Sequence, residues 1–243
     1  MGLVKMPTIK KRGNAAKNRQ PEQEIRTLAH NASEFMAAHR KNLTIIVAAF
    51  AAVLIIVAGL RLMRSMQEQK ATPLVAAAYG YYSPLQGTGA DFARALDLFR
   101  SVQKQYPSTR NGAIAQYYVG NCLANLGRND EALTEYKAFV AKYAGDKFLL
   151  GLVYERMGYV YSALGKQAEA VRAFEQSETF IGPGVSTMEL AKLYESAGNV
   201  SGSQQKYKLI ADKLAGTAWA MEAMGKVQKI APLQMPAPPT GGK

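Results

Sequence analysis

The hydrophobic pattern divides the chain into one long apolar run and a later series of amphipathic segments. The run is LTIIVAAFAAVLIIVAGL, residues 43–60, 18 residues without a charge. As a helix it is about 27 Å long, close to the roughly 30 Å hydrocarbon core of a bilayer. A helix of a soluble core usually keeps a polar stripe, and this run has none. The pattern therefore predicts a transmembrane anchor over residues 42–64.

Basic residues flank this run unevenly. Nine Lys or Arg precede it, whereas the twenty residues that follow contain only Arg61, Arg64 and Lys70. Because Lys and Arg are enriched on the cytoplasmic side of a span, we expect a cytoplasmic N-terminus and everything after the span outside. In a bacterium this places the anchor in the inner membrane and the rest of the chain in the periplasm. The preceding stretch is too long for a cleaved signal peptide.

Two segments precede the anchor. Residues 1–20 contain six Lys or Arg and no acid, which predicts a basic disordered cytoplasmic arm attracted to anionic lipid headgroups. This arm has no aromatic residue that could stack on bases, so a nucleic-acid partner is not expected. Residues 21–41 are predicted to form an amphipathic juxtamembrane helix. Its apolar face consists of Ile25, Leu28, Ala32, Phe35 and Met36.

After the anchor, three segments repeat the same spacing of small and large residues, with starts 38 and 33 residues apart. The first comprises Gly120, Leu123, Gly127, Ala132 and Tyr136. The second comprises Gly158, Tyr161, Gly165, Ala170 and Phe174. The third comprises Ala191, Tyr194, Gly198, Ser203 and Tyr207. A degenerate earlier copy retains Ala95, Phe99 and Pro107, after AAAYGYY and an inserted loop.

Each position of the repeat has a physical role in a pair of packed helices. The first glycine lets two helices approach closely, and the second, such as Gly127, suits the turn that ends the first helix. Asn129 is a predicted N-cap for the second helix. Ala132 marks the crossing of the two helices, and the later aromatic fills the gap between pairs. One such pair cannot bury its own apolar face, so the copies must stack.

This pattern resembles the tetratricopeptide repeat over roughly residues 74–215. The resemblance implies an all-α fold, in which the transmembrane helix is followed by a right-handed superhelix of about three to four helix pairs. We expect this domain to occupy residues 65–230. Residues 217–230 are a predicted capping helix, with Trp219 packed into the end of the stack. Residues 231–243 are Pro-rich and predicted to be disordered.

The reactive side chains argue against an enzyme and against any cofactor or metal. The chain has one cysteine, Cys122, and its two histidines, His30 and His39, lie before the anchor. The main domain therefore cannot form a disulfide, a His-based metal site or a catalytic triad. Cys122 lies beside Gly120, where a small side chain is needed, so we expect a buried and inert thiol.

In tetratricopeptide domains the first helix of each pair lines a concave face that holds a partner's segment. The resemblance places eight candidate partner-binding residues on these faces. They are Tyr117, Asn121, Asn125, Glu155, Tyr159, Ser162, Lys192 and Glu195. Tyrosine offers a large flat surface with a hydroxyl, and asparagine offers adaptable hydrogen bonds. A clamp for chaperone C-termini is not expected, because Tyr117 stands where such clamps carry a Lys or Arg.

The order of arm, anchor and repeat domain is similar to that of YfgM-type ancillary subunits of the bacterial Sec translocon. FMAAHRKNLTIIVAAF resembles that family's entry into its anchor, and AAAYGYY lies where its first outer helix begins. The resemblance implies a scaffold beside the translocon that binds translocon subunits, a periplasmic chaperone or a nascent chain. An anchored scaffold or subunit of another envelope complex, such as a division, pilus or secretion apparatus, remains open, as does a mitochondrial inner-membrane protein.

Overall fold

The computed structural model describes residues 30–31, 34, 37–83 and 89–230. The predicted arm at 1–20, the Pro-rich tail at 231–243 and the apolar face of the predicted juxtamembrane helix lie outside the described residues. The chain divides into two compact units, Met1–Leu62 and Met63–Lys243.

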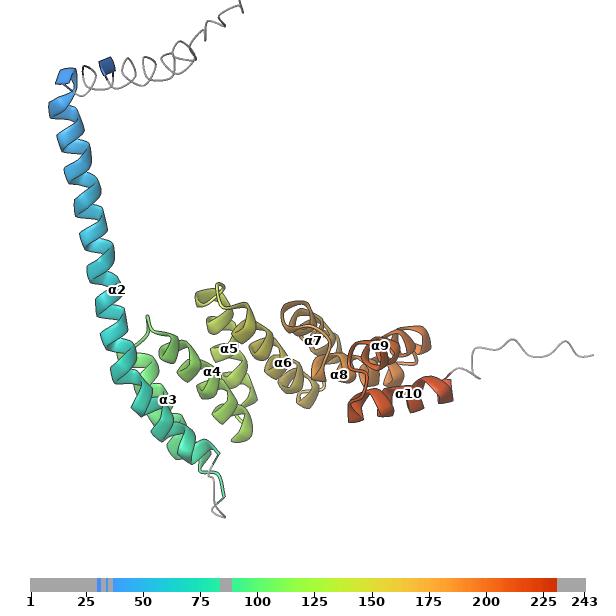
Figure 1. Cartoon of the computed structure of the whole chain (residues 1–243). Coiled ribbons are helices and arrows are strands. Elements are labelled where there is room, and N and C mark those ends of the chain that lie inside the picture. Colours follow the sequence, from blue (N-terminus) through green and yellow to red (C-terminus); the bar gives the residue numbers. More distant parts are fainter. Residues whose placement is uncertain (1–29, 32–33, 35–36, 84–88, 231–243) are drawn as a thin grey trace, which may run out of the picture. The chain divides into compact units, whose positions relative to one another are not determined.

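The first unit contains the N-terminal part of helix α2, which runs from Arg40 to Tyr82 (Figure 1). The most apolar 18-residue window of α2 has a mean hydropathy of 2.9, and 0% of that window is buried. Most of its large side chains are more than half exposed, for example Phe50 at 64% and Ile55 at 72%. Within the described ranges, α2 is the one helix that is long and apolar enough to cross a membrane.

The second unit contains the C-terminal part of α2 and a row of helices that follow one another in sequence order (Figure 1). From α3 onward, each helix packs on the next, and α4 also packs on α6. The bounds are α3 (Phe92–Gln105), α4 (Arg110–Asn125), α5 (Asn129–Lys142), α6 (Lys147–Ala163), α7 (Gln167–Ile181), α8 (Val185–Ser196), α9 (Val200–Lys213) and α10 (Ala218–Ile230). The predicted all-α fold of stacked helix pairs is confirmed for the described part of this unit, and the right-handed sense of the stack stays a prediction.

The helix pairs are held together by a small residue facing an aromatic ring. A Cβ atom added at Gly120 would overlap the ring of Tyr136, and one added at Gly158 would lie 2.6 Å from Cε1 of Phe174. Both rings are buried: Tyr136 is 0% exposed and Phe174 1%. The predicted role of the two glycines in close helix approach is therefore confirmed.

The turn inside each pair also follows the prediction, with one correction. Gly127 has a φ of 75°, and Gly165 and Gly198 each have a φ of 72°, in the left-handed region that glycine adopts without strain. The prediction that Asn129 caps α5 is wrong. The cap is Arg128, whose carbonyl accepts from the backbone N–H of Ala132, so the helix begins one residue earlier and Asn129 lies in its first turn.

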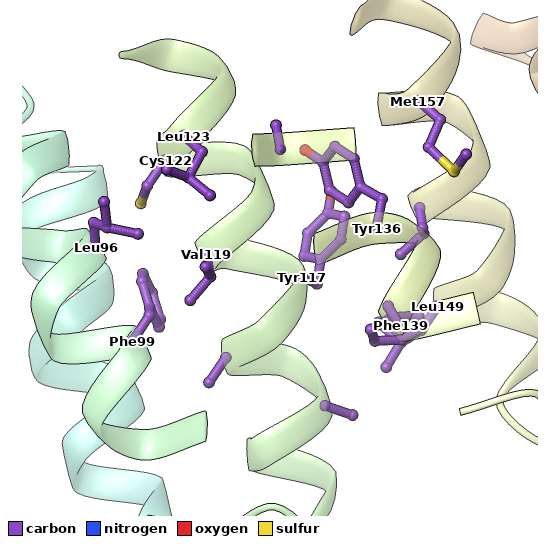
Figure 2. Packing of buried hydrophobic residues seen from close by; sticks show 14 of the residues in the cluster. Leu96, Phe99, Tyr117, Val119, Cys122, Leu123, Tyr136, Phe139, Leu149 and Met157 are labelled. Atoms are coloured by element: carbon purple, nitrogen blue, oxygen red, sulfur yellow. The ribbon is translucent and has the colours of Figure 1, made fainter. Parts of the chain in front are cut away.

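The largest apolar cluster extends from the C-terminal part of α2 to α7. Figure 2 shows Phe99 of α3 near Val119 of α4, and Tyr136 between α4 and Met157 of α6. Cys122 is 0% exposed, and burial raises the pKa of its thiol to about 12. The prediction of a buried thiol is therefore confirmed.

The last helix, α10, lies where the capping helix was predicted, but one side chain is placed differently. Ala220, Ala223 and Ile230 form its buried face and are at most 6% exposed. Trp219 is 44% exposed. The prediction that Trp219 packs into the end of the stack is therefore wrong, because the small alanines, which let α10 approach α9, occupy the contact face instead.

Candidate functional site

A groove lies between the first helices of two successive pairs, α4 and α6. We call it the α4–α6 groove; its volume is about 220 Å³. It is lined by Tyr82 at the end of α2, by Asn121, Ala124 and Asn125 of α4, by Asn129 and Tyr136 of α5, and by Arg156, Tyr159, Val160 and Ala163 of α6.

Helical spacing explains why these side chains meet. The four α6 residues lie at positions i, i+3, i+4 and i+7, which share one face of a helix. The three α4 residues, from Asn121 to Asn125, lie at positions i, i+3 and i+4. Because α4 and α6 pack side by side in the stack, these two faces form opposite walls of the groove.

The floor of the groove is held by a buried hydrogen bond. The hydroxyl of Tyr136 donates to Oδ1 of Asn121 at 2.6 Å. Tyr136 is 0% exposed and Asn121 is 3% exposed. Burial raises the pKa of Tyr136, so the phenol stays protonated and keeps donating. A satisfied buried pair of this kind fixes the position of both side chains.

Tyr159 and Arg156 of α6 also line the groove. Tyr159 is half-buried and packs edge-to-face on Phe174, with ring centroids 5.2 Å apart. Burial, with the nearby Glu189 and Glu155, raises the pKa of Tyr159 to about 12, so its hydroxyl is neutral at physiological pH. Arg156 is exposed, and its Nε donates to the Tyr117 hydroxyl at 3.3 Å.

The structure brings three of the eight predicted partner-binding residues together in the groove: Asn121, Asn125 and Tyr159. Asn125 is exposed, and its Nδ2 donates to the Asn121 carbonyl at 2.8 Å. Tyr117 is only 7% exposed and belongs to the apolar core, and its hydroxyl accepts the hydrogen bond from Arg156. Partner binding by all of these residues stays a prediction.

Three of the other predicted residues make contacts elsewhere in the domain. Glu155 accepts a hydrogen bond from the Ser186 hydroxyl at 3.2 Å. Lys192 pairs with Glu189 at 3.1 Å. Glu195 accepts from the Tyr207 hydroxyl at 2.8 Å and pairs with Lys226 at 3.0 Å. These hydrogen bonds from Lys226 and Tyr207 lower the pKa of Glu195.

These three side chains therefore serve contacts within the domain. The fourth, Ser162, is half-buried near the end of α6 and does not line the groove.

Sequence reasoning missed Tyr82, Asn129 and Arg156. For α6 it chose residues 155, 159 and 162, of which only Tyr159 lines the groove. The sequence did contain a signal: Arg156, Tyr159, Val160 and Ala163 have a shared helical spacing that includes one cation. The crossing of α4 and α6, which decides which face is presented, cannot be read from one sequence.

The described residues include few metal-binding or thiol groups. Among them, no group of three or more His, Cys, Asp or Glu is placed to hold a metal ion. Cys122 is buried, and its raised pKa leaves it as an unreactive thiol. The groove itself contains amides, phenols and one guanidinium, which can hydrogen-bond to a bound peptide.

Comparisons with known proteins agree with this geometry. Residues 114–146 match a family model described as a tetratricopeptide repeat. A tetratricopeptide repeat protein from Parabacteroides merdae ATCC 43184 superposes with a TM-score of 0.54 at 14% identity, covering 68% of this chain and 61% of that one. The chain thus spans less than two thirds of that protein.

A second solved structure consists of TPR-like repeats of a putative kinesin light chain from Podosopora anserina, which are nearly identical to one another. It superposes on this chain with a TM-score of 0.51 at 17% identity, covering 67% of this chain and 85% of that one. No curated protein sequence matches the chain. At these identities the likeness shows the fold alone. The chain therefore has a tetratricopeptide-repeat fold, with a recognisable repeat at residues 114–146.

Proposed function

We propose that this chain is a membrane-anchored protein-interaction scaffold whose α4–α6 groove holds a segment of a partner protein. The groove carries the proposal, because it combines exposed amides, a half-buried tyrosine and an arginine on a rigid helical frame. Such side chains recognise peptides through hydrogen bonds and flat apolar contact. Tetratricopeptide folds generally serve protein–protein interaction, and the groove is the site that we propose for this role.

The anchor in this proposal is the N-terminal part of α2. None of its apolar window is buried by the described chain, and the hydrocarbon core of a bilayer would cover this apolar surface. The excess of Lys and Arg before the window supports a cytoplasmic N-terminus. The repeat domain then faces the outside, the bacterial periplasm. Protease added to spheroplasts should digest residues beyond 60, and protection of the repeat domain would reverse this orientation.

The finer proposal is an ancillary role at the Sec translocon, in which the repeat domain recruits a periplasmic chaperone or holds an emerging envelope protein. Its support is the resemblance in layout to YfgM-type subunits: a basic arm, one anchor and a small repeat domain in that order. The basic arm would contact anionic lipid headgroups in this arrangement.

Affinity purification of the full chain from membranes in mild detergent tests this role. We expect translocon subunits among the recovered proteins. A double variant, Asn125→Ala with Tyr159→Ala, should lose the partner held by the groove while the anchor contacts persist. Lys137→Ala is the control, because Lys137 is exposed on α5 outside the groove. Recovery of a different envelope assembly without translocon subunits would contradict the translocon role. The more general proposal of a protein-interaction scaffold would still hold.

A further inference from the structure

The α4–α6 groove has one charged side chain in its lining, Arg156. Within the described part of the chain, no carboxylate lies within ion-pair distance of Arg156. Some of the domain's other cations are paired with acids. Exposed arginines such as Arg128 and Arg172 each pair with a glutamate on their own helix or its cap.

The nearby Glu155 interacts electrostatically with Arg156 without forming an ion pair with it. Glu155 precedes it in the chain, but its Oε2 accepts a hydrogen bond from the Ser186 hydroxyl on α8. Arg156 in turn is oriented by its Nε, which donates to the Tyr117 hydroxyl. Tyr117 is only 7% exposed and therefore a rigid support. This bond orients the guanidinium, whose other N–H donors form no hydrogen bond within the described residues.

Amide groups extend along the groove beside this charge. Asn121 uses Oδ1 to accept from Tyr136, and Asn125 uses Nδ2 to donate to the Asn121 carbonyl. The Asn121 amide nitrogen has no hydrogen-bond partner among the described residues, and the Asn125 side chain also lies within hydrogen-bonding reach of the Tyr82 hydroxyl. Amide groups at adjacent turns of α4 can pair with the alternating N–H and C=O groups of an extended peptide. Asn129 adds a third amide in the same direction.

We propose that the groove selects an extended peptide segment with an internal Asp or Glu side chain, whose carboxylate is bound by Arg156. This inference rests on the proposed function and names the chemistry of its partner. An arginine fork binds a carboxylate through two parallel N–H donors, a geometry that a neutral amide cannot match. The groove's single cation matches one side-chain carboxylate, and its amides bind the main chain that continues beside it.

Four peptide libraries test this selection on the full chain in nanodiscs. Each contains random ten-residue peptides with an amidated C-terminus and a fixed central Glu, Gln or Lys. The fourth has a central Gln and a free C-terminal carboxylate. Recovery from each library is measured for the unchanged chain. We expect about tenfold enrichment of the Glu library over the Gln library, which is the ratio that one charge-assisted hydrogen bond gives. Raising the salt concentration should reduce this preference.

Three variants localise the preference. Arg156→Gln should abolish the difference between the Glu and Gln libraries, and Arg156→Lys should retain part of it. Arg172→Gln is the matched control, because Arg172 is an exposed arginine on α7 outside the groove, and this variant should behave as the unchanged chain. Circular dichroism of each variant should match the parent, since neither arginine is buried.

The outcomes separate this inference from the proposed function. Equal recovery of the Glu and Gln libraries, or a preference that survives Arg156→Gln, would overturn acid selection while leaving a peptide-binding groove. Preference for the free C-terminus library would also overturn it, in favour of a chain end. Recovery of no library above background would contradict both the inference and the groove's role as a peptide site.

Discussion

At the residue scale, each repeat packs an aromatic ring of its second helix against a small residue of its first helix. Gly120 faces Tyr136, and Gly158 faces Phe174, at the same separation of sixteen residues. In the third copy Ala191 and Tyr207 occupy these positions, and both are 0% exposed. The ring of Tyr136 has a second use, because its hydroxyl fixes Asn121 at the floor of the groove. The same packing that stabilises the pair therefore shapes the site.

Gly120→Ala should destabilise the domain by about 1–3 kcal/mol, because the added methyl overlaps the buried Tyr136 ring. Gly225→Ala is the control: Gly225 lies inside α10 with nothing within 4 Å of an added Cβ. That change should be neutral or stabilising by up to about 1 kcal/mol. Denaturant unfolding followed by circular dichroism measures both, and equal free energies of unfolding for the two variants would refute the close-approach role.

Cys122 provides a pH prediction. Burial raises the pKa of its thiol to about 12, so at pH 8 almost no thiolate exists in the folded protein. The folded chain should therefore resist iodoacetamide at pH 8. In denaturant the thiol pKa returns to about 8.5, and a single alkylation should occur. Mass spectrometry measures the added mass. Fast alkylation of the folded chain would show that the α3–α4 contact is looser than the structure has it.

At the element scale, the C-terminal part of α2 is joined to α4 through a carboxylate. Oε2 and Oε1 of Glu68 accept from the backbone N–H groups of Arg110 and Asn111 at 2.8 and 2.9 Å. These donors lie in the first turn of α4, where helical N–H groups lack partners and negative charge is favoured. The Asn111 side chain also donates to Thr72 Oγ1 at 2.9 Å. Glu68 therefore caps a helix that is distant in the sequence.

Glu68→Ala should lower the free energy of unfolding by about 1–2 kcal/mol, the usual effect of losing an N-cap. Amide hydrogen exchange should accelerate at residues 110 and 111 before it does so elsewhere in α4. Gln69→Ala is the neighbouring control, since Gln69 is exposed. If amide hydrogen exchange at residues 110 and 111 is unchanged in the Glu68 variant, the capping role of Glu68 is contradicted.

The last element, α10, provides a spectroscopic prediction. Trp219 is the only tryptophan in the chain and is 44% exposed. Its fluorescence should be quenched by iodide in the folded state, and Trp219→Ala should change stability by less than about 0.5 kcal/mol. By contrast, Ile230→Ala removes a side chain that is 6% exposed and should cost about 2–5 kcal/mol. Protection of Trp219 from iodide would contradict its exposed position and would favour the buried position predicted from its hydrophobicity.

At the scale of the whole molecule, the sequence predicted the apolar span, the all-α class, the turns and the small-to-large packing, because local spacing alone determines these. It did not predict features that depend on where distant helices meet. Trp219 was expected inside because it is large and apolar, yet two alanines occupy the contact face of α10. Arg156 was missed because the crossing of α4 and α6 selects the groove-lining face. The Glu68 cap joins residues 42 apart and leaves no local signal.

The central claim is that the α4–α6 groove of the anchored chain holds a partner's segment. The most direct test places a photo-crosslinking benzoylphenylalanine at Ala163, which is exposed in the groove, or at Lys137 outside it. Cells that express either full-length variant are irradiated, and membrane proteins are separated by size. The account predicts a discrete adduct from position 163 and none from position 137. No adduct at 163, or the same adduct at both positions, would contradict it.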